Sequence, residues 1–259
     1  ISFNRNKVLE LGGEDYKEMA EGDGHIKTGS VRRLIAGEPI GVFYGYRFDG
    51  IFQNEEECKQ QTSSASPIGV GLRRYKDLNG DGKVDAANDR EILGDANPKF
   101  FGGLTNTFAY KGFELNVFLQ YSYGNKILNY NAMELENPTG GQNAYADMVN
   151  RWTPENPSNI YPKATTNRAI LASDRFIEDG SYLKLKTLSL SYSFPKINMK
   201  HIQGLRLYVT GQNLLTWTKY RGYDPEVSYR GASTLEAGED FGGYPQSRTF
   251  MFGVKLDIK

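Results

Sequence analysis

Residues 113–124 read FELNVFLQYSYG, and their alternation decides the fold. Successive side chains of a strand point to opposite faces, so the odd-numbered positions of this stretch form an apolar face. Glu114, Asn116 and Gln120 lie on the other, mostly polar face. The stretch is longer than the usual strand of about 5–6 residues. It matches the roughly 9–11 residues with which a tilted strand crosses a bilayer, so it predicts a membrane-crossing strand.

The same alternation recurs in other stretches along the chain. They are Leu104–Tyr110, Tyr182–Phe194, Leu205–Leu215 and Phe250–Ile258, and the opening Ile1–Leu9 is expected to add a further strand. In one of these stretches Lys184 and Lys186 share the phase of the apolar residues. That end of the strand is therefore expected to leave the apolar zone or to carry a β-bulge.

The connections between these stretches are unequal in length. Lys111 and Gly112 form a two-residue hairpin turn, and the connection after Phe194 is also short. Long segments of about residues 11–99, 125–181 and 216–246 make the remaining connections. Short turns on one side and long loops on the other are typical of an outer-membrane β-barrel, whose long loops are extracellular. The alternative that the pattern leaves open is a soluble β-sandwich, because a sandwich also buries one face of each strand.

An open sheet cannot stand in lipid, because its edge N–H and C=O groups would lack partners where there is no water. Five or six strands are too few to form a membrane-spanning barrel. The sequence therefore predicts an all-β chain that is one part of a larger multi-pass barrel in the outer membrane. The other strands are expected to precede Ile1.

Composition excludes several classes of function. The chain has 259 residues, 31 Lys and Arg, and 31 Asp and Glu, so its net charge is zero. A neutral chain offers no electrostatic footprint for nucleic acid, and no nucleic-acid partner is expected. One cysteine excludes an internal disulfide framework. Because no nucleophile elbow, phosphate loop or catalytic pairing of Ser and His is present, the protein is not expected to be an enzyme.

Residues 77–89 carry the sharpest local motif, DLNGDGKVDAAND. Oxygen-bearing side chains at positions 1, 3 and 5 with glycine at position 6 are the signature of a calcium loop. A Glu is expected at position 12, where this chain has Asn88, so the second half of the pattern departs from the signature. The predicted ligands for Ca²⁺ are Asp77, Asn79, Asp81, Lys83 through its carbonyl, Asp85 and Asp89. The alternative is a polar turn that binds no ion.

Several ordered motifs resemble the C-terminal portion of the SusC/RagA-type TonB-dependent outer-membrane receptors. They are residues 41–52 (GVFYGYRFDGIF), 75–82 (YKDLNGDG), 94–100 (GDANPKF), 178–185 (EDGSYLKL), 211–217 (GQNLLTW), 222–226 (GYDPE) and 244–250 (YPQSRTF). The resemblance implies a 22-stranded barrel, of which residues 1–259 would supply about the last six strands. It also implies an N-terminal plug domain, absent here, and energy drawn through TonB, which contacts that missing N-terminal part.

The resemblance further implies a function and partners. A SusD-type surface lipoprotein would close over the extracellular loops. The receptor would import nutrients, with oligosaccharides as the first expectation and peptides as in the RagA branch. The sequence assigns no substrate-binding residue. The alternative function is that of a soluble calcium-binding β-sandwich that binds glycans or a partner protein.

Overall fold

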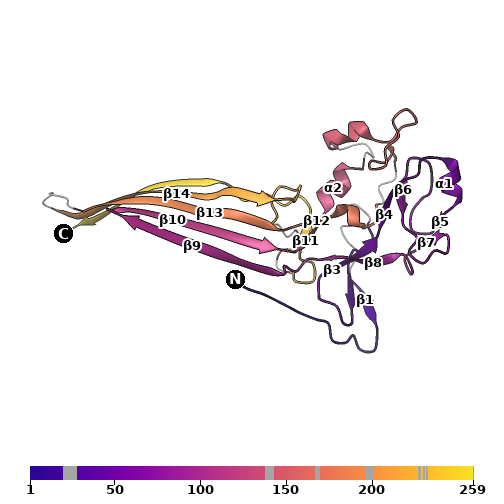
Figure 1. Cartoon of the computed structure of the whole chain (residues 1–259), viewed down its shortest axis with the longest axis horizontal. Coiled ribbons are helices and arrows are strands. Elements are labelled where there is room, and N and C mark those ends of the chain that lie inside the picture. The colour runs from indigo at the N-terminus through magenta and orange to yellow at the C-terminus, as the bar shows by residue number, and fades with distance from the viewer. Residues whose placement is uncertain are drawn as a thin grey trace.

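The computed structural model describes residues 1–19, 28–137, 143–166, 170–195, 201–226, 229, 231 and 233–258. A long antiparallel sheet extends from a compact group of short strands and helices, which we call the cap (Figure 1). The sheet has five strands in the order β16-β14-β13-β10-β9. These are β9 (Phe100–Tyr110), β10 (Phe113–Tyr123), β13 (Tyr182–Phe194), β14 (Ile202–Thr218) and β16 (Thr249–Ile258). All five coincide with stretches that alternation predicts.

A tight turn joins β9 to β10 at the end of the sheet remote from the cap (Figure 1). Lys111 and Gly112 both have positive φ, 45° and 87°. Two central residues with positive φ define the type I′ turn, whose twist suits a two-residue hairpin. The predicted turn is therefore confirmed.

The opening stretch Ile1–Leu9 does not form the strand expected of it. Ser2 makes one antiparallel bridge to Phe101 of β9. Further along, the Val8 N–H donates to the carbonyl of Glu38, and the Val8 carbonyl accepts from Gly37. The opening stretch therefore contributes one bridge to the sheet at Ser2, and by Val8 its backbone pairs with the cap instead.

The register of the sheet places the predicted apolar residues on one face. Residues directly opposite each other in an antiparallel pair point to the same side. Leu115 lies opposite Phe108 and Leu190, and Val209 lies opposite Leu190 and Phe252. The apolar face consists of Leu104, Phe108, Phe113, Leu115, Val117, Leu119, Leu188, Leu190, Leu205, Leu207, Val209, Phe250, Phe252, Val254 and Leu256. The polar face includes Glu114, Asn116, Gln120, Ser189, Ser191, Arg206, Thr210, Gln212 and Lys255.

A β-bulge interrupts β13 at Lys186. Phe118 of β10 lies opposite Thr187, and the next residue, Leu119, lies opposite Leu185. Lys186 is therefore the extra residue, and the bulge restores the alternation on both sides of it. Lys184 lies opposite Gln120 and so joins the polar face. Of the two alternatives expected for this end of the strand, the structure shows the bulge.

The cap is formed by the segments predicted as long loops, which fold into short elements. These are β1 (Tyr16–Glu18), β2 (Arg33–Ile35), β3 (Val42–Tyr46), β4 (Phe48–Ile51), α1 (Glu55–Lys59), β5 (Thr62–Ser63), β6 (Arg73–Tyr75), β7 (Lys83–Val84), β8 (Arg90–Asp95), β11 (Lys126–Asn129), α2 (Tyr130–Leu135), the 3₁₀ helices η1 (Ala146–Asn150) and η2 (Asp174–Phe176), β12 (Ile177–Asp179) and β15 (Glu239–Asp240). Among the described residues no helix has the length and apolar character needed to cross a membrane.

The cap has its own hydrophobic core, built from all three long segments. Val31, Phe43, Leu128, Tyr130 and Phe176 are buried in one cluster. A buried ion pair of 2.8 Å between Arg32 and Glu239 ties the first segment to the third. The cap is thus a folded unit rather than a set of independent loops.

Candidate functional site

The apolar face of the sheet is exposed. Phe252 is 81% exposed, and Phe250 and Val254 are each 61% exposed. The cap gathers at one end of the sheet and does not cover this face (Figure 1). A contiguous apolar surface of this size marks contact with a membrane or with another protein.

Aromatic rings mark both ends of the apolar face. Near the β9–β10 turn, the ring centroids of Phe113 and Tyr192 lie 4.5 Å apart. Near the cap, Phe100 stacks on Tyr123 at 5.0 Å and meets Tyr121 edge-on at 6.2 Å. The two groups are separated by the eight-residue step from Phe113 to Tyr121, about 27 Å at 3.4 Å per residue. Aromatic girdles flanking an apolar band of about 25 Å are characteristic of transmembrane barrels.

A charged cluster occupies the opposite face at its cap end. The Lys184 ammonium donates to Asp224 at 2.6 Å and to Glu226 at 2.6 Å. The Lys186 ammonium donates to Glu226 at 2.7 Å and to the Gln246 side chain at 2.9 Å. The bulge makes this cluster possible, because it brings both lysines to the polar face.

Neighbouring strands complete the hydrogen bonding of these carboxylates. Glu226 also accepts from the Gln120 amide at 2.8 Å and from the Tyr182 hydroxyl at 3.2 Å. Asp224 accepts from the backbone N–H groups of Glu226 at 2.9 Å and Gln246 at 3.3 Å. Each buried charge therefore has several partners, as buried charges require.

Burial and hydrogen bonding oppose each other in setting the pKa values of the two carboxyls. Burial raises the pKa of Asp224, but hydrogen bonds from Lys184 and two backbone N–H groups outweigh it and hold the pKa below its usual value. The pKa of Glu226 is likewise lowered, because hydrogen bonds from Lys184 and Lys186 outweigh its burial. Both groups are ionised at neutral pH, so the cluster is suited to fixing the loop against the wall rather than to proton transfer.

Sequence reasoning singled out the two lysines but missed their partners. Lys184 is 2% exposed and Asp224 is 6% exposed. Two lysines that alternate in step with apolar residues need carboxylates nearby to balance their charges. The next long segment carries two carboxylates, Asp224 and Glu226. The need of the lysines for counter-ions was therefore the signal in the sequence that could have identified these partners.

The first half of the predicted calcium loop binds its own backbone. Asp77 accepts from the N–H groups of Gly80 and Gly82, both at 2.7 Å. Asn79 accepts from the Asp81 N–H at 3.2 Å, and Asp81 accepts from the Lys83 N–H at 2.8 Å. These are the Asx-type turns that Asn and Asp form without any ion.

The second half of this loop is anchored by Asp89, whose side chain is buried. Its two oxygens accept from the N–H groups of Leu78 and Asp85, both at 2.7 Å. Asp85 accepts from the N–H of Asn88 at 3.0 Å and pairs with the Lys83 ammonium at 3.1 Å. Nowhere in the described part of the chain do three His, Cys, Asp or Glu residues form a group that could hold a metal ion. Calcium binding here stays a prediction.

Comparisons with known proteins identify relatives over the whole chain, although no family model matches. TonB-dependent receptor P3 of Formosa agariphila is 38% identical over 262 residues, which cover 99% of this chain and 26% of that receptor. TonB-dependent receptor SusC of Bacteroides thetaiotaomicron is 26% identical and is matched over 100% of this chain and 24% of its own length. None of these names is that of an enzyme.

Solved structures of the RagAB peptide transporter share the fold. One has a TM-score of 0.73 at 24% identity, covering 98% of this chain and 26% of that chain. The open-open state of the RagAB peptide importer gives a TM-score of 0.71 at 23% identity over 98% of this chain and 25% of that one.

The chain is therefore related along its whole length to the SusC/RagA-type TonB-dependent receptors, and the expected resemblance is confirmed. It spans about a quarter of the curated relatives it matches. The expected fold class is also confirmed, because the all-β architecture matches that of a transmembrane β-barrel. In such a barrel the apolar face meets lipid and the polar face lines the interior.

Proposed function

We propose that this chain forms part of the wall and the extracellular cap of an outer-membrane barrel that imports nutrients by TonB-dependent active transport. The observation that carries the proposal is the exposed apolar face, bounded by aromatic rings at both ends and backed by a polar face. Water-soluble proteins rarely leave so large an apolar surface uncovered. The whole-length similarity to receptors named TonB-dependent supports the same conclusion.

The proposal extends to substrate and partners. Oligosaccharides are the proposed nutrient, and a SusD-type surface lipoprotein is the proposed partner on the cap side. TonB would act through the N-terminal part of the receptor. Peptides are the second candidate, supported by the fold shared with a protein described as a peptide importer.

The alternative of a soluble sandwich explains the structure less well. A sandwich packs a second sheet on the apolar face of the first, about 10 Å away. Among the described residues no strand outside the five packs on this face, and the cap has a core of its own. Exposed Phe250 and Phe252 would then face water.

Uptake measurements test the proposal. Cells lacking the protein that contains this chain would be compared with complemented cells for uptake of a labelled oligosaccharide pool and a labelled oligopeptide pool. We expect the loss of oligosaccharide uptake alone, and the same loss when TonB is removed. Loss of peptide uptake alone would assign the peptide class. Unchanged uptake of both pools, or recovery of the protein in the soluble fraction, would contradict the proposal.

A further inference from the structure

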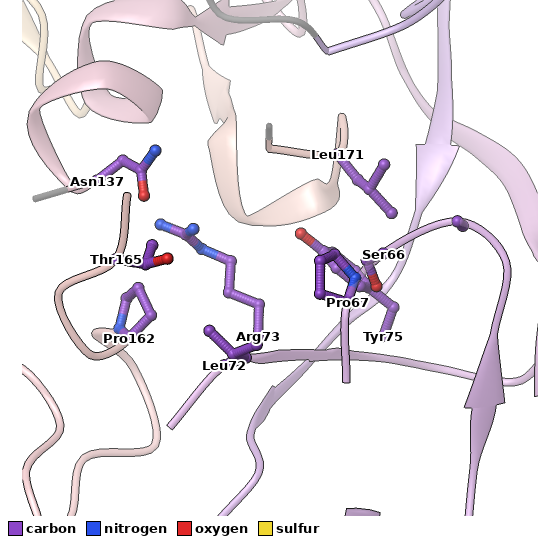
Figure 2. A pocket seen from close by; sticks show the side chains of 10 residues that line it. Ser66, Pro67, Leu72, Arg73, Tyr75, Asn137, Pro162, Thr165 and Leu171 are labelled. Atoms are coloured by element: carbon purple, nitrogen blue, oxygen red, sulfur yellow. The ribbon is translucent and has the colours of Figure 1, made fainter. Parts of the chain in front are cut away.

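A small pocket of about 140 Å³ lies inside the cap (Figure 2). Its walls include the apolar side chains of Pro67, Leu72, Pro162 and Leu171. Two polar side chains from separate segments, Arg73 of β6 and Asn137 after α2, also line it. Figure 2 shows the Arg73 guanidinium reaching across the pocket toward Asn137.

Arg73 is short of partners. Its Nε is buried and has no hydrogen-bond partner, and Nη2 donates to the carbonyl of Glu136 at 3.1 Å. Across the described ranges no carboxylate lies within 4.0 Å of this guanidinium. The carboxylate of Glu136 is already bound by Arg175 at 2.6 Å and by Arg221 at 3.1 Å. Burial lowers the pKa of Arg73, as expected for a cation without a counter-ion.

The neighbouring arginine shows what is missing. Arg74 pairs with Asp49 at 2.9 Å and with Glu57 at 3.4 Å. It is the same residue type on the same strand, yet its charge is matched on the cap surface. The unmatched cation is the one that faces the pocket.

Asn137 adds an unsatisfied acceptor to the same pocket. The residue is buried, and its Oδ1 has no hydrogen-bond partner. Buried polar groups in folded proteins nearly always have partners, so each exception requires an explanation. Here two exceptions line one cavity, and a bound group that both accepts and donates would satisfy them together.

We propose that this pocket binds a carboxylate end group that carries a hydroxyl or amide N–H on the adjacent atoms. Guanidinium and carboxylate match in charge and in the geometry of their hydrogen bonds. The adjacent O–H or N–H would donate to Asn137. A cavity of about 150 Å³ accommodates benzene, so this pocket takes an end group of roughly six heavy atoms rather than a chain.

Two natural sources share this chemistry, a uronic acid and the C-terminal residue of a peptide. Binding of galacturonate and of N-acetylglycine to the detergent-purified protein that contains this chain would be measured by calorimetry. Galactose and N-acetylglycinamide are the neutral counterparts. We expect at least one carboxylate to bind and its neutral counterpart to bind at least tenfold more weakly. Binding of galacturonate would identify a uronic acid as the source, and binding of N-acetylglycine would identify the C-terminal residue of a peptide.

Two arginine variants form a matched pair. Arg73→Met removes the charge that faces the pocket and should weaken carboxylate binding at least tenfold. Arg74→Met removes an equal charge from the adjacent residue and should leave binding unchanged. Asn137→Asp keeps the shape of the side chain but places a second carboxylate beside Arg73, so it should abolish carboxylate binding. This variant tests the proposal independently should Arg73→Met fail to fold.

The proposal is overturned if neither acid binds at concentrations up to about 10 mM. Equal binding by the wild type and Arg73→Met, or by the wild type and Asn137→Asp, would overturn it as well. The binding measurement does not require transport, so it separates the two proposals. Carboxylate binding without TonB-dependent uptake would contradict only the proposed function, and uptake without carboxylate binding would contradict only the pocket.

Discussion

The sheet and the cap treat the same residue type in opposite ways. Phe252 in the sheet is 81% exposed, whereas Phe43 and Phe176 in the cap are 1% and 0% exposed. The cap buries its apolar side chains as a protein in water does. The sheet presents them outward, as the lipid-facing strands of a transmembrane β-barrel do. One chain is therefore built for two solvents, with the boundary at the aromatic rings beside the cap.

Polar groups follow the same division. The apolar face of the sheet holds aliphatic and aromatic rows, while charges are drawn to its other side and to the cap. Lys184 and Lys186 reach the polar face only through an irregularity in β13. The β-bulge distorts the strand locally, and it thereby keeps the lysine charges off the apolar face.

The largest effect is expected from a substitution that creates a cavity in the hydrophobic core of the cap. Phe176→Ala should lower the free energy of unfolding of the cap by about 3–5 kcal/mol, because the surrounding core cannot close the space. Resistance of the cap to proteolysis, measured across a denaturant series in detergent, reports this change. Phe252→Ala is the control. It should cost less, because lipid or detergent fills the vacated volume. Equal losses would contradict the two-solvent comparison.

A charge on the lipid-facing side comes next. Val117→Arg places a cation in the middle of the apolar band and should cost about 2–4 kcal/mol. The folded fraction in the outer membrane, measured by heat-modifiable gel mobility, should fall sharply. Asn116→Arg adds the same side chain one residue earlier, on the polar face. Its folded fraction should remain near that of the wild type, and a matching fall would mean that the faces are misassigned.

A smaller effect is expected in the loop of residues 77–89. Asp89→Ala leaves the partly buried N–H groups of Leu78 and Asp85 without acceptors and should cost about 1–3 kcal/mol. Thermal unfolding monitors the loss. Asp81→Ala, at an exposed position, should cost little in the absence of calcium. If calcium raises the melting temperature of the wild type but not of Asp81→Ala, the predicted metal loop is confirmed; no rise for either would contradict it.

The smallest effect on stability is expected when the pH is lowered. Asp224 and Glu226 have folded-state pKa values below the ordinary 3.8 and 4.5. A lowered pKa contributes stability that is present above the unfolded-state value and is lost as the pH falls through the folded-state value. The difference in melting temperature between the wild type and Glu226→Gln should therefore be constant from pH 8 to about pH 5 and shrink below about pH 4. A difference that grows on acidification would contradict the assignment of the cluster.

Sequence reasoning predicted the sheet well because period-2 alternation is a local signal. It located β10 and β13, and it anticipated an irregularity near Lys184 and Lys186. The cap was expected as loops, because its strands of two to six residues carry no readable period. Its order comes from distant contacts, such as the pairing of Arg32 with Glu239, 207 residues away. No local pattern contains such a contact.

The candidate sites show the same limit. The calcium motif was recognised from spacing, but spacing does not reveal that its oxygens accept backbone N–H groups. The partners of the two lysines and the pocket around Arg73 both join segments that are far apart in the sequence. Sites that combine residues distant in the sequence can be recognised only in the folded structure.

The single extra residue in β13 has a consequence for how this strand can change during evolution. Counting from the β9–β10 turn, side chains alternate faithfully until Lys186, where the count restarts. Deleting that one position would place Leu185 directly after Thr187, still opposite Leu119, and Lys184 still opposite Gln120, so both side chains would keep their faces. Replacing the side chain at 186 would leave this order intact. At this one position the arrangement of faces is thus insensitive to the loss of the residue as well as to the identity of its side chain.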